Sequence, residues 1–303
     1  MTDATIRFAK GHGAGNDFIV LPDPAARIRL TAEMVRSLCD RRTGIGADGI
    51  LRAVHSTALS EAAAMAGEAE WFMDYRNADG SRGSMCGNGI RVFARYLADT
   101  GLCPVGTHAI ATRAGVRHVH IPRHHQEESD ITVAMGEPLF PGPDGITVTA
   151  AGREWPALHI NVGNPHAVAF VDALGDAGDL QMAPTVTPGN AYPEGVTVEF
   201  VTIQGPQHLA VRVHERGVGE TPACGTGACA AVAALRRHQH HTSPGKYMVA
   251  FPGGRLCIDV DANGLMGLTG PAAIVAEGTA AFTSTSPAPR PRITEQRAHT
   301  ATS

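Results

Sequence analysis

The sequence predicts an α/β protein of the α+β type, built from two similar domains related by a pseudo-two-fold axis. Its 303 residues exceed what one typical compact core holds, since domains most often contain about 100–200 residues. A short motif, Cys-Gly-x-Gly followed by an apolar helical pattern, occurs twice, at Cys86 and at Cys224. Strand patterns precede each copy. This duplication favours two domains whose matching motifs meet in one cleft.

In the first half of the chain, strand patterns alternate with two helical patterns. Thr31 is a suitable helix cap, and the residues that follow predict a helix ending at Arg41-Arg42. After Cys86, the apolar side chains at positions 90, 93, 94 and 97 share one helical face, and Gly101 is a suitable stop. The runs that predict strands are Ile6–Phe8, Phe18–Leu21 and Trp71–Tyr75.

The second half repeats this plan. Residues 228–241, ACAAVAALRRHQHH, predict a largely apolar helix with a cationic last turn, which the helix dipole favours. Strand patterns lie on both sides of this helix. They are Leu209–His214, the segments VAFPGG and RLCIDV (249–260), and Leu265–Leu268.

We expect the domain boundary to follow residue 135. The first domain then covers residues 1–135 with Cys86, and the second covers 136–282 with Cys224. The last strand region, near 270–282, is a segment that can rejoin the first domain. From about Thr283 the chain is rich in Ser, Pro, Thr and Arg without periodicity, which predicts a disordered tail over residues 283–303.

Composition and charge argue against several classes of protein. A net charge of −4 without a block of Lys or Arg argues against nucleic-acid binding. We expect a cytoplasmic protein with no membrane partner, because there is no signal-peptide pattern and no apolar run of roughly 18–20 residues. In a reducing compartment the six cysteines are expected to be thiols. None lies in a CxxC pair, so we expect no metal site.

A cysteine at the start of a helix is suited to proton chemistry. The first N–H groups of a helix have no intrahelical acceptor, and with the helix dipole they stabilise a thiolate and lower its pKa. The glycines after Cys86 and Cys224 carry no side chain, so the same N–H groups can also hold a carboxylate. The motif can therefore bind an amino acid by its α-carboxylate with a sulfur beside the α-hydrogen.

Two such motifs suit the inversion of a stereocentre. One residue removes a proton from one face of the carbon, and an opposed residue returns a proton to the other face. Thiols suit this task because their pKa values can be tuned near the working pH. Two helix N-termini would stabilise the charge that spreads into the carboxylate. Cys86 and Cys224 therefore predict a cofactor-independent amino-acid epimerase.

Other interpretations of the cysteines stay open. A lone Cys is more often a small apolar core residue than a catalyst. The cysteines to which we assign that role are Cys39, Cys103, Cys229 and Cys257. From a different class of function, the chain could be a non-catalytic amino-acid-binding or redox-sensing protein whose paired thiols only respond to oxidant.

At these residues the chain resembles the diaminopimelate epimerases, which interconvert LL- and meso-diaminopimelate in lysine and cell-wall synthesis. The resemblance extends from about residue 6 to residue 278. The matching segments are KGHGAGNDF (10–18), RRTGIGADG (41–49), YRNADGS (75–81), MCGNGIRVFARY (85–96), VGNPH (162–166), VHERGVGETPACGTGACAA (213–231) and FPGG (251–254). It implies two domains, each a mixed or antiparallel β-sheet curled around a central helix, with the active site in the cleft between them. It also implies independence from PLP and metals, and hence no cofactor.

The resemblance implies a role for each matching residue. Cys86 and Cys224 would be the acid and the base. Arg216, with Asn77, would bind the distal carboxylate through a bidentate fork. His166, with Glu215, would modulate the pKa values of the thiols. The implied substrate-binding residues are Asn16, Asn77, Gly87, Asn88, Asn164, Thr197, Glu215, Arg216, Gly225 and Thr226.

Within this set, the backbone N–H groups of Gly87, Asn88, Gly225 and Thr226 would bind the α-carboxylate. Asn164 and Glu215 would bind amino groups. Simpler interpretations remain for three of the residues. Asn77 and Asn164 could be turn residues, and His166 could be a structural histidine.

Two related families narrow the expectation. Proline racemases resemble this design but have a histidine at the position of Asn88. Phenazine-biosynthesis isomerase-like proteins share the fold but lack the paired cysteines. This chain has both cysteines and the asparagine, so it is more similar to the diaminopimelate group.

The chain departs from the family pattern at Thr197. Members usually show an Asn in a segment like PxGxNVxF, whereas this chain has YPEGVTVEF (192–200). Thr is shorter than Asn, and a lost hydrogen bond to a charged group costs about 1.5–3 kcal/mol. Gly49 also replaces the Gln that some members carry.

The sequence therefore predicts an isomerase, a diaminopimelate epimerase with an amino-acid substrate, acting as a homodimer. The alternative is an epimerase or racemase of another amino acid on the same scaffold, which the change at Thr197 motivates.

Overall fold

The computed structural model describes residues 4–123, 130–141, 145–282 and 291–298. The chain forms two compact units. Unit 1 comprises residues 1–133 and 271–303, and unit 2 comprises residues 134–270. Unit 2 is therefore one continuous segment inserted between two parts of unit 1.

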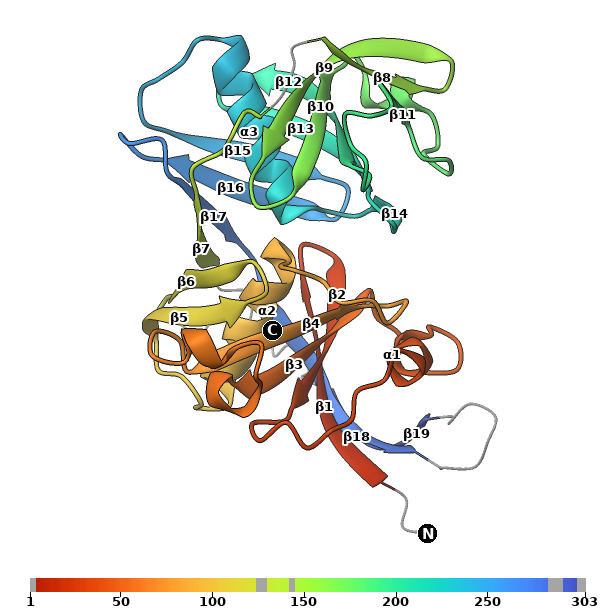
Figure 1. The fold of residues 1–303 in the computed structure, drawn as a ribbon, viewed down its shortest axis with the longest axis vertical. Helices are drawn as coiled ribbons and strands as arrows, with labels where there is room; N and C mark the ends of the chain where they lie inside the picture. The colour runs from red at the N-terminus through yellow and green to blue at the C-terminus, as the bar shows by residue number, and fades with distance from the viewer. Residues whose placement is uncertain (1–3, 124–129, 142–144, 283–290, 299–303) are drawn as a thin grey trace. The chain divides into compact units, whose positions relative to one another are not determined.

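Unit 1 is built on a mixed sheet (Figure 1). Parallel pairing joins β2 to β3 and β4 to β5, and the other neighbours are antiparallel. Helix α1 (Ala32–Cys39) lies between β2 and β3, and the 3-10 helices η1 (Ser56–Ala58) and η2 (Ala63–Met65) follow β3. In spatial order the strands are β19 (Pro291–Ala298), β18 (Ala273–Phe282), β1 (Ala4–Gly13), β2 (Asn16–Pro22), β3 (Gly49–His55), β4 (Trp71–Asn77), β5 (Gly106–Thr112), β6 (Gly115–Ile121) and β7 (Ile131–Gly136), whose last residues belong to unit 2.

Unit 2 has a similar mixed sheet. Its parallel pairs are β10 with β12 and β13 with β15. A short strand β14 (Gly219–Thr221) pairs with β13, and η3 (Leu174–Ala177) follows β10. In spatial order the main strands are β11 (Thr185–Thr187), β8 (Ile146–Ala150), β9 (Arg153–Asn161), β10 (Pro165–Phe170), β12 (Thr197–Gly205), β13 (His208–Glu215), β15 (Gly245–Phe251), β16 (Gly254–Val260) and β17 (Met266–Gly270).

The two units repeat one order of pairing. In each, an antiparallel hairpin (β1–β2 or β9–β10) is followed by a parallel neighbour (β3 or β12) and then by an antiparallel one (β4 or β13). Residues of the two units can therefore be matched by register. Phe18 on β2 pairs with Gly49 on β3, and His166 on β10 pairs with Thr197 on β12. Asn16 thus corresponds to Asn164, Phe18 to His166, and Leu51 to Glu199.

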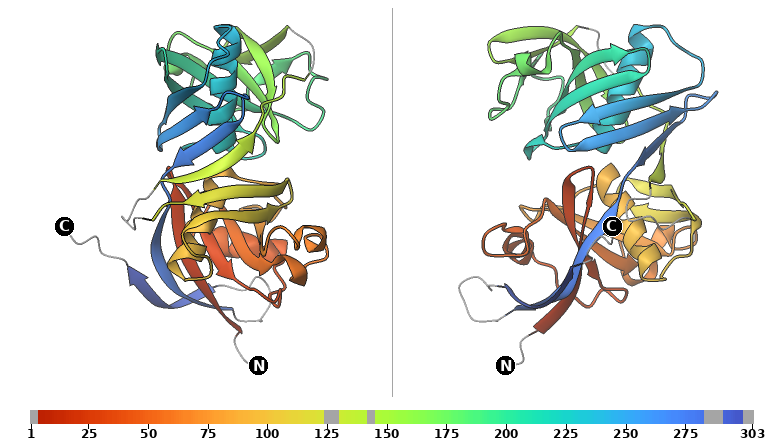
Figure 2. Two further views of the ribbon diagram at one scale, coloured as in Figure 1. Left: turned by 90° about the vertical axis from the view of Figure 1, so that its left-hand side faces the viewer. Right: turned by 180° about the vertical axis from the view of Figure 1, so that it is seen from behind.

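One long helix fills the core of each unit. Helix α2 (Gly87–Asp99) is buried from its first residue to Leu97, and α3 (Gly225–His238) is buried from its first residue to Leu235. Helix α2 contacts β1, β2 and β18, and α3 contacts β9, β10, β12 and β13 (Figures 1 and 2). The predicted α+β class, with a sheet around a central helix in each unit, is confirmed.

The helix predicted after Thr31 forms but ends earlier than expected. Thr31 Oγ1 accepts a hydrogen bond from the Met34 N–H at 3.2 Å, which caps the helix start. The helix ends at Cys39 and not at Arg42. The reason lies in the Asp40 carboxylate, which accepts bonds from the N–H groups of Arg42 (2.8 Å) and Thr43 (2.6 Å). These bonds compete with continued helix.

The prediction of a disordered tail is wrong for residues 291–298. These residues form β19, which pairs antiparallel with β18 from Phe282↔Pro291 to Ala276↔Ala298. The physical reason is the edge of β18, whose backbone N–H and C=O groups are not all used by β1 and can pair with a returning segment. Residues 283–290 and 299–303 of the predicted tail lie outside the described residues.

Candidate active site

Cys86 stands at the N-cap of α2, directly before its first residue. Its backbone is extended, and its Sγ accepts a hydrogen bond from the Gly89 N–H at 3.3 Å. The side chain is only partly buried. The sulfur thus lies at the positive end of the helix dipole, beside the first backbone donors of the helix.

Asn16 connects Cys86 with Asn88. The Asn16 Oδ1 accepts from the Cys86 thiol (3.7 Å) and from the Asn88 Nδ2 (3.3 Å). The Asn16 Nδ2 in turn donates to the Asp48 Oδ2 at 2.7 Å. The Asp48 carboxylate therefore turns the Asn16 carbonyl toward the sulfur.

The acidic support of Asn16 was not predicted. Asp48 Oδ2 also accepts from the Asp17 N–H at 3.2 Å, and the Arg41 Nη2 binds both Asp17 Oδ1 (2.6 Å) and Asp48 Oδ1 (2.8 Å). Burial opposes ionisation of Asp17, but hydrogen bonds from Arg41 and Lys10 hold the pKa of this carboxyl well below its usual range. The sequence signal was the Gly-Asn-Asp and Gly-Ala-Asp turns, which meet only through the β2–β3 pairing.

Asn77 lies at the end of β4 and acts as a turn residue, which is the alternative interpretation given for it in the sequence analysis. Its Nδ2 donates to the Ser81 Oγ at 2.9 Å, and its N–H donates to the Ser81 carbonyl at 3.0 Å. These bonds close the NADGS turn. The structure brings Asn16, Cys86, Gly87 and Asn88 together in unit 1, whereas the side-chain bond of Asn77 stays within its own turn.

Cys224 repeats the geometry of Cys86 at the N-cap of α3. Its Sγ accepts from the Gly227 N–H at 3.3 Å, and the Thr226 Oγ1 lies 3.3 Å from the sulfur. The Gly227 N–H at the helix start lowers the thiol pKa as expected, but larger effects outweigh it. Burial raises the pKa of Cys224 well above its ordinary value, and the charges of Glu215 and Glu199 raise it further. The bonds from Thr226 and Gly227 act in the opposite direction but are the smaller effects.

His166 is bound on both ring nitrogens. Its Nδ1 lies 2.6 Å from the Glu199 Oε1, and its Nε2 lies 3.1 Å from the Asn164 Oδ1. Glu199 was missed by the sequence reasoning, because it sits in a strand pattern, GVTVEF, with no motif of its own. Its only sequence signal was a charged residue at a position that alternation places inside the sheet.

Thr197 and Arg216 contact each other, and Glu215 contacts Thr221. The Thr197 Oγ1 accepts from the Arg216 N–H at 3.4 Å, and the Arg216 Nη1 donates to the Glu194 carbonyl at 3.2 Å. The Glu215 Oε1 accepts from the Thr221 hydroxyl at 2.5 Å. Thr197 is therefore engaged with the backbone at Arg216, which fixes the start of the segment leading to Cys224.

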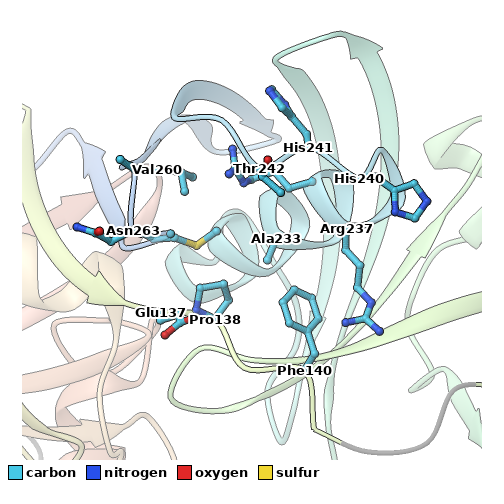
Figure 3. A pocket seen from close by; sticks show the side chains of 14 residues that line it. Glu137, Pro138, Phe140, Ala233, Arg237, His240, His241, Thr242, Val260 and Asn263 are labelled. Carbon is cyan, nitrogen blue, oxygen red and sulfur yellow. The ribbon is translucent and has the colours of Figure 1, made fainter.

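Two of the cavities among the described residues are lined entirely by unit 2. One, of about 320 Å³, is lined by Tyr192, His214 and Arg216 among others, so it adjoins a predicted site residue. The other, of about 680 Å³, lies at the C-terminal end of α3 between Phe140, Arg237, His240 and Asn263 (Figure 3). No predicted site residue lines this second cavity.

Among the described residues, no group of three or more His, Cys, Asp or Glu side chains is arranged to hold a metal ion. In unit 1, Asp17 and Asp48 bind Arg41. In unit 2, His166 binds Glu199 and Asn164.

Comparison with known proteins decides the family. A family sequence model described as "Diaminopimelate epimerase" matches residues 8–141 and 158–275. The diaminopimelate epimerase of Streptomyces coelicolor is 54% identical over 278 residues, covering 90% of this chain and 94% of that protein. The chain belongs to the diaminopimelate epimerase family. Its enzyme class is isomerase, as the sequence predicted.

Further members of the family cover the chain equally well. The diaminopimelate epimerase of Thermobifida fusca is 45% identical over 280 residues, covering 90% of this chain and 97% of that protein. The diaminopimelate epimerase of Corynebacterium glutamicum is 44% identical over 276 residues, covering 90% of this chain and 98% of that protein.

Solved structures share the fold of this diaminopimelate epimerase family member. A phenazine biosynthesis protein of the PhzF family from Bacillus anthracis matches with a TM-score of 0.66 and 17% identity, covering 91% of this chain and 99% of that chain. A hydroxyproline epimerase from Agrobacterium vitis matches with a TM-score of 0.62 and 16% identity, covering 91% of this chain and 92% of that chain. At these identities the likeness establishes the fold alone.

Proposed function

We propose that this chain interconverts LL- and meso-diaminopimelate, with Cys86 and Cys224 as the two groups that exchange protons with the α-carbon. The observation that carries the proposal is one sulfur geometry found in both units. In each, a cysteine caps the central helix, and its Sγ accepts an N–H bond at 3.3 Å from the glycine three residues on. The relatives named above bear the name of this activity.

The proposed reaction has two proton transfers at one carbon. The thiolate of one cysteine removes the α-hydrogen, and the electron pair of the C–H bond spreads into the α-carboxylate. The thiol of the other cysteine donates its proton to the opposite face. Gly87 with Asn88, and Gly225 with Thr226, open the two helices and are the proposed donors to the carboxylate. The reaction requires both sulfurs to reach one α-carbon from opposite sides.

Cys224 is the proposed proton donor when a substrate first binds. Burial raises its pKa, and the charges of Glu215 and Glu199 raise it further, so at neutral pH it carries a proton. Once the Cys86 thiol has released its proton to solvent, its thiolate can remove the α-hydrogen of the substrate enantiomer that presents this hydrogen to Cys86. The reverse direction starts from the state in which the proton has moved to Cys86.

We assign binding of the distal carboxylate of the substrate to Arg216 and Asn77. Glu215 is assigned to bind an amino group of the substrate. An arginine can bind a carboxylate through two parallel N–H bonds. The Arg216 side chain is 43% exposed, and its Nη1 lies 4.0 Å from the exposed Glu194 carboxylate, which a substrate carboxylate would replace.

An epimerase of another amino acid is the second candidate, and Thr197 is the observation that favours it. Its hydroxyl accepts a backbone bond from Arg216, and the residue is only 4% exposed. A hydroxyl held in this way does not replace the longer carboxamide that family members usually carry there.

The test is exchange of the α-hydrogen in deuterated water. We expect wild-type protein to incorporate deuterium into LL-diaminopimelate faster than into any other amino acid of a panel. Exchange with another amino acid, and none with diaminopimelate, would refute the proposed substrate.

The same assay tests the two sulfurs. Cys86→Ala and Cys224→Ala should each lower the exchange rate by about a thousandfold or more, since general acid–base groups contribute about 10²–10⁴-fold. Cys257→Ala, on β16, is the matched control and should keep the wild-type rate. Wild-type rates in either of the first two variants would exclude the two-thiol mechanism.

Thr197→Asn tests the distal end of the substrate. We expect the variant to lower KM for diaminopimelate by about 10-fold or more, because a carboxamide adds a hydrogen bond to a charged group worth about 1.5–3 kcal/mol. Steady-state kinetics with diaminopimelate and with the panel give the comparison. A rise in KM, with folding intact, would mean that threonine is already suited to the distal group.

We further propose a cytoplasmic homodimer. Among the described residues, no helix has the length and the apolar character that crossing a bilayer requires. Sedimentation equilibrium of the full chain gives the mass in solution, and a monomer at micromolar concentration would refute the dimer.

A further inference from the structure

Glu199 and His166 form a pair that is completely buried in unit 2. Both side chains are 0% exposed, and the His166 Nδ1 lies 2.6 Å from the Glu199 Oε1. The second oxygen of Glu199, Oε2, has no hydrogen-bond partner among the described residues. A buried carboxylate with one free oxygen is costly unless its charge is neutralised.

The contacts of His166 determine how many protons the pair holds. The ring lies between two oxygens, the Glu199 Oε1 at Nδ1 and the Asn164 Oδ1 at Nε2. A carbonyl oxygen only accepts, so Nε2 must carry a hydrogen. At Nδ1 the hydrogen belongs either to the ring or to a protonated Glu199. In both cases the pair shares two protons and has no net charge.

This arrangement fixes the orientation of Asn164. Its carbonyl oxygen accepts from the His166 Nε2–H, so its Nδ2 group, which carries two N–H donors, points away from His166. Asn164 therefore presents donors and not an acceptor. A carboxylate is the substrate group that such donors fit, in place of the amino group expected from the sequence.

Unit 1 shows that the fold does not need a polar pair at this place. The residues that correspond by register to His166 and Glu199 are Phe18 and Leu51, both completely buried. They pack beneath Gly89 as Glu199 packs beneath Gly227. A Cβ at Gly89 would lie 3.1 Å from Leu51 Cδ2, and one at Gly227 would lie 2.7 Å from Glu199 Oε1. An apolar pair fills the same space without the cost of burying a carboxyl group.

We propose that Glu199 is a positioning residue which, through His166, holds the Asn164 carboxamide with its N–H donors toward a substrate carboxylate. The inference rests on the proposed function for the identity of that substrate. The parallel pairing of β10 with β12 places Glu199 beneath the first turn of α3, where a charge would act on Cys224. Because the pair has no net charge, it acts on Cys224 less than an unpaired Glu199 carboxylate would.

The titratable groups around the pair agree with a neutral state. Burial raises the pKa of Glu199, and the charge of His166 opposes this rise. The neighbours are His159 on β9, Tyr192, whose hydroxyl donates to the His166 carbonyl at 3.4 Å, and the Cys224 thiol with Glu215 beyond it. Burial lowers the pKa of His159 and raises that of Tyr192, so both are uncharged at neutral pH.

A pair of substitutions at Glu199 separates positioning from packing. Glu199→Gln can still donate a hydrogen to Nδ1, so Nε2–H is kept and KM and kcat should stay within about threefold of wild type. Glu199→Leu fills the same space but cannot bond to His166, and KM should rise by about 10- to 100-fold, the effect of one lost hydrogen bond to a charged group. Asp259→Asn, an exposed carboxylate of the same unit, is the control and should change neither constant. Equal kinetics in the Gln and Leu variants would overturn the proposal.

The double variant His166→Phe with Glu199→Leu reproduces the apolar pair of unit 1. It should melt at or above the wild-type temperature, because well-packed apolar residues often replace a buried polar pair without loss. It should nevertheless lose affinity for diaminopimelate at least as far as Glu199→Leu does. Wild-type affinity in a folded double variant would show that the pair positions nothing.

A measurement without substrate keeps this inference separate from the proposed function. ¹⁵N NMR of His166, assigned by loss of its signals in His166→Phe, reports which ring nitrogens carry hydrogen. We expect a protonated Nε2 in wild type and in Glu199→Gln. A bare Nε2 in wild type would overturn the inference whatever the exchange assay shows. An inactive wild-type protein with a protonated Nε2 would refute the proposed substrate alone.

Discussion

Cys86 and Cys224 occupy the same position in their units but lie in different surroundings. Cys86 is partly buried and donates to a neutral amide, Asn16. Cys224 is buried, and its carboxylate neighbours Glu215 and Glu199 add to the effect of burial in raising its pKa. The helix N-terminus alone therefore does not decide whether a sulfur is a thiol or a thiolate. For Cys224, burial and then the charges of Glu215 and Glu199 outweigh it.

The charge of Glu215 can be tested directly on Cys224. Glu215→Gln removes a negative charge near the sulfur, so the pKa of Cys224 should fall and its rate of alkylation by iodoacetamide at pH 8 should rise severalfold. Mass spectrometry of the Cys224 peptide measures the rate. Cys39 is the internal reference, since burial raises its pKa to about 12 and it belongs to unit 1. A slower reaction at Cys224 in the variant would contradict the electrostatic account.

At the scale of elements, the first turn of each central helix is packed directly on the sheet. Gly89 and Gly227 both donate to their capping cysteine, and both face a strand at a distance that leaves little room for a side chain. The side chains beneath the two turns differ. It is the flexible methyl end of Leu51 under Gly89 and the hydrogen-bonded carboxyl of Glu199 under Gly227.

This difference predicts unequal costs for the same substitution. Gly227→Ala must displace Glu199 from His166 and should destabilise the protein by about 1–3 kcal/mol, the usual effect of overpacking. Gly89→Ala should cost less, because a Leu methyl group can move by a few tenths of an ångström. Urea unfolding of both variants gives the comparison. A larger loss in Gly89→Ala would show that the register match between the units is misleading.

How far the sequence could predict the molecule depends on the range of each interaction. The helix start at Thr31, the two cysteine caps and the duplicated plan follow from residues close in the chain, and they could be identified. The Glu199–His166 pair joins residues 33 positions apart, through a parallel β10–β12 pairing that no local pattern specifies. Asp48 meets Asn16 in the same way through β2 and β3. The β19 strand was missed because its pairing depends on the edge of β18 and not on its own composition.

At the scale of the whole molecule, the two units differ in their buried charges. Unit 1 contains a buried cluster of charged side chains around Asp74 on β4, and the matching strand of unit 2, β13, carries a more exposed ion pair instead. Asp74 on β4 binds Arg76 (2.8 Å), Arg52 (3.2 Å) and Arg113 (2.5 Å), and its side chain is 1% exposed. On the matching strand β13, Arg212 binds the more exposed Glu220 at 2.7 Å. Burial raises the pKa of Asp74, but bonds from Arg76 and Arg113 outweigh it and leave the pKa below the ordinary 3.8.

The cluster predicts acid sensitivity of unit 1. A carboxyl with a lowered pKa in the folded state contributes stability above its unfolded pKa, and that contribution is lost as the pH falls through about 3.8 and below. Asp74→Asn should cost about 3–5 kcal/mol at pH 7, since it removes the buried charge that three arginines share, and should flatten the pH dependence. In a Trp155→Phe background, fluorescence of the buried Trp71 on β4 reports on unit 1. An unchanged pH slope in Asp74→Asn would assign the sensitivity to other carboxyls.

The insertion of unit 2 within unit 1 bears on the order in which the protein is made. The ribosome synthesises β1 first and its edge partner β18 almost last, with all of residues 134–270 between them. The inserted segment can thus acquire its full set of strand partners while the chain is still tethered. The surrounding unit meanwhile has an open strand edge, which is the kind of surface that chaperones protect and that invites association between nascent chains. The sheet of unit 1 can therefore be completed by β18 only after the whole of unit 2 has been synthesised.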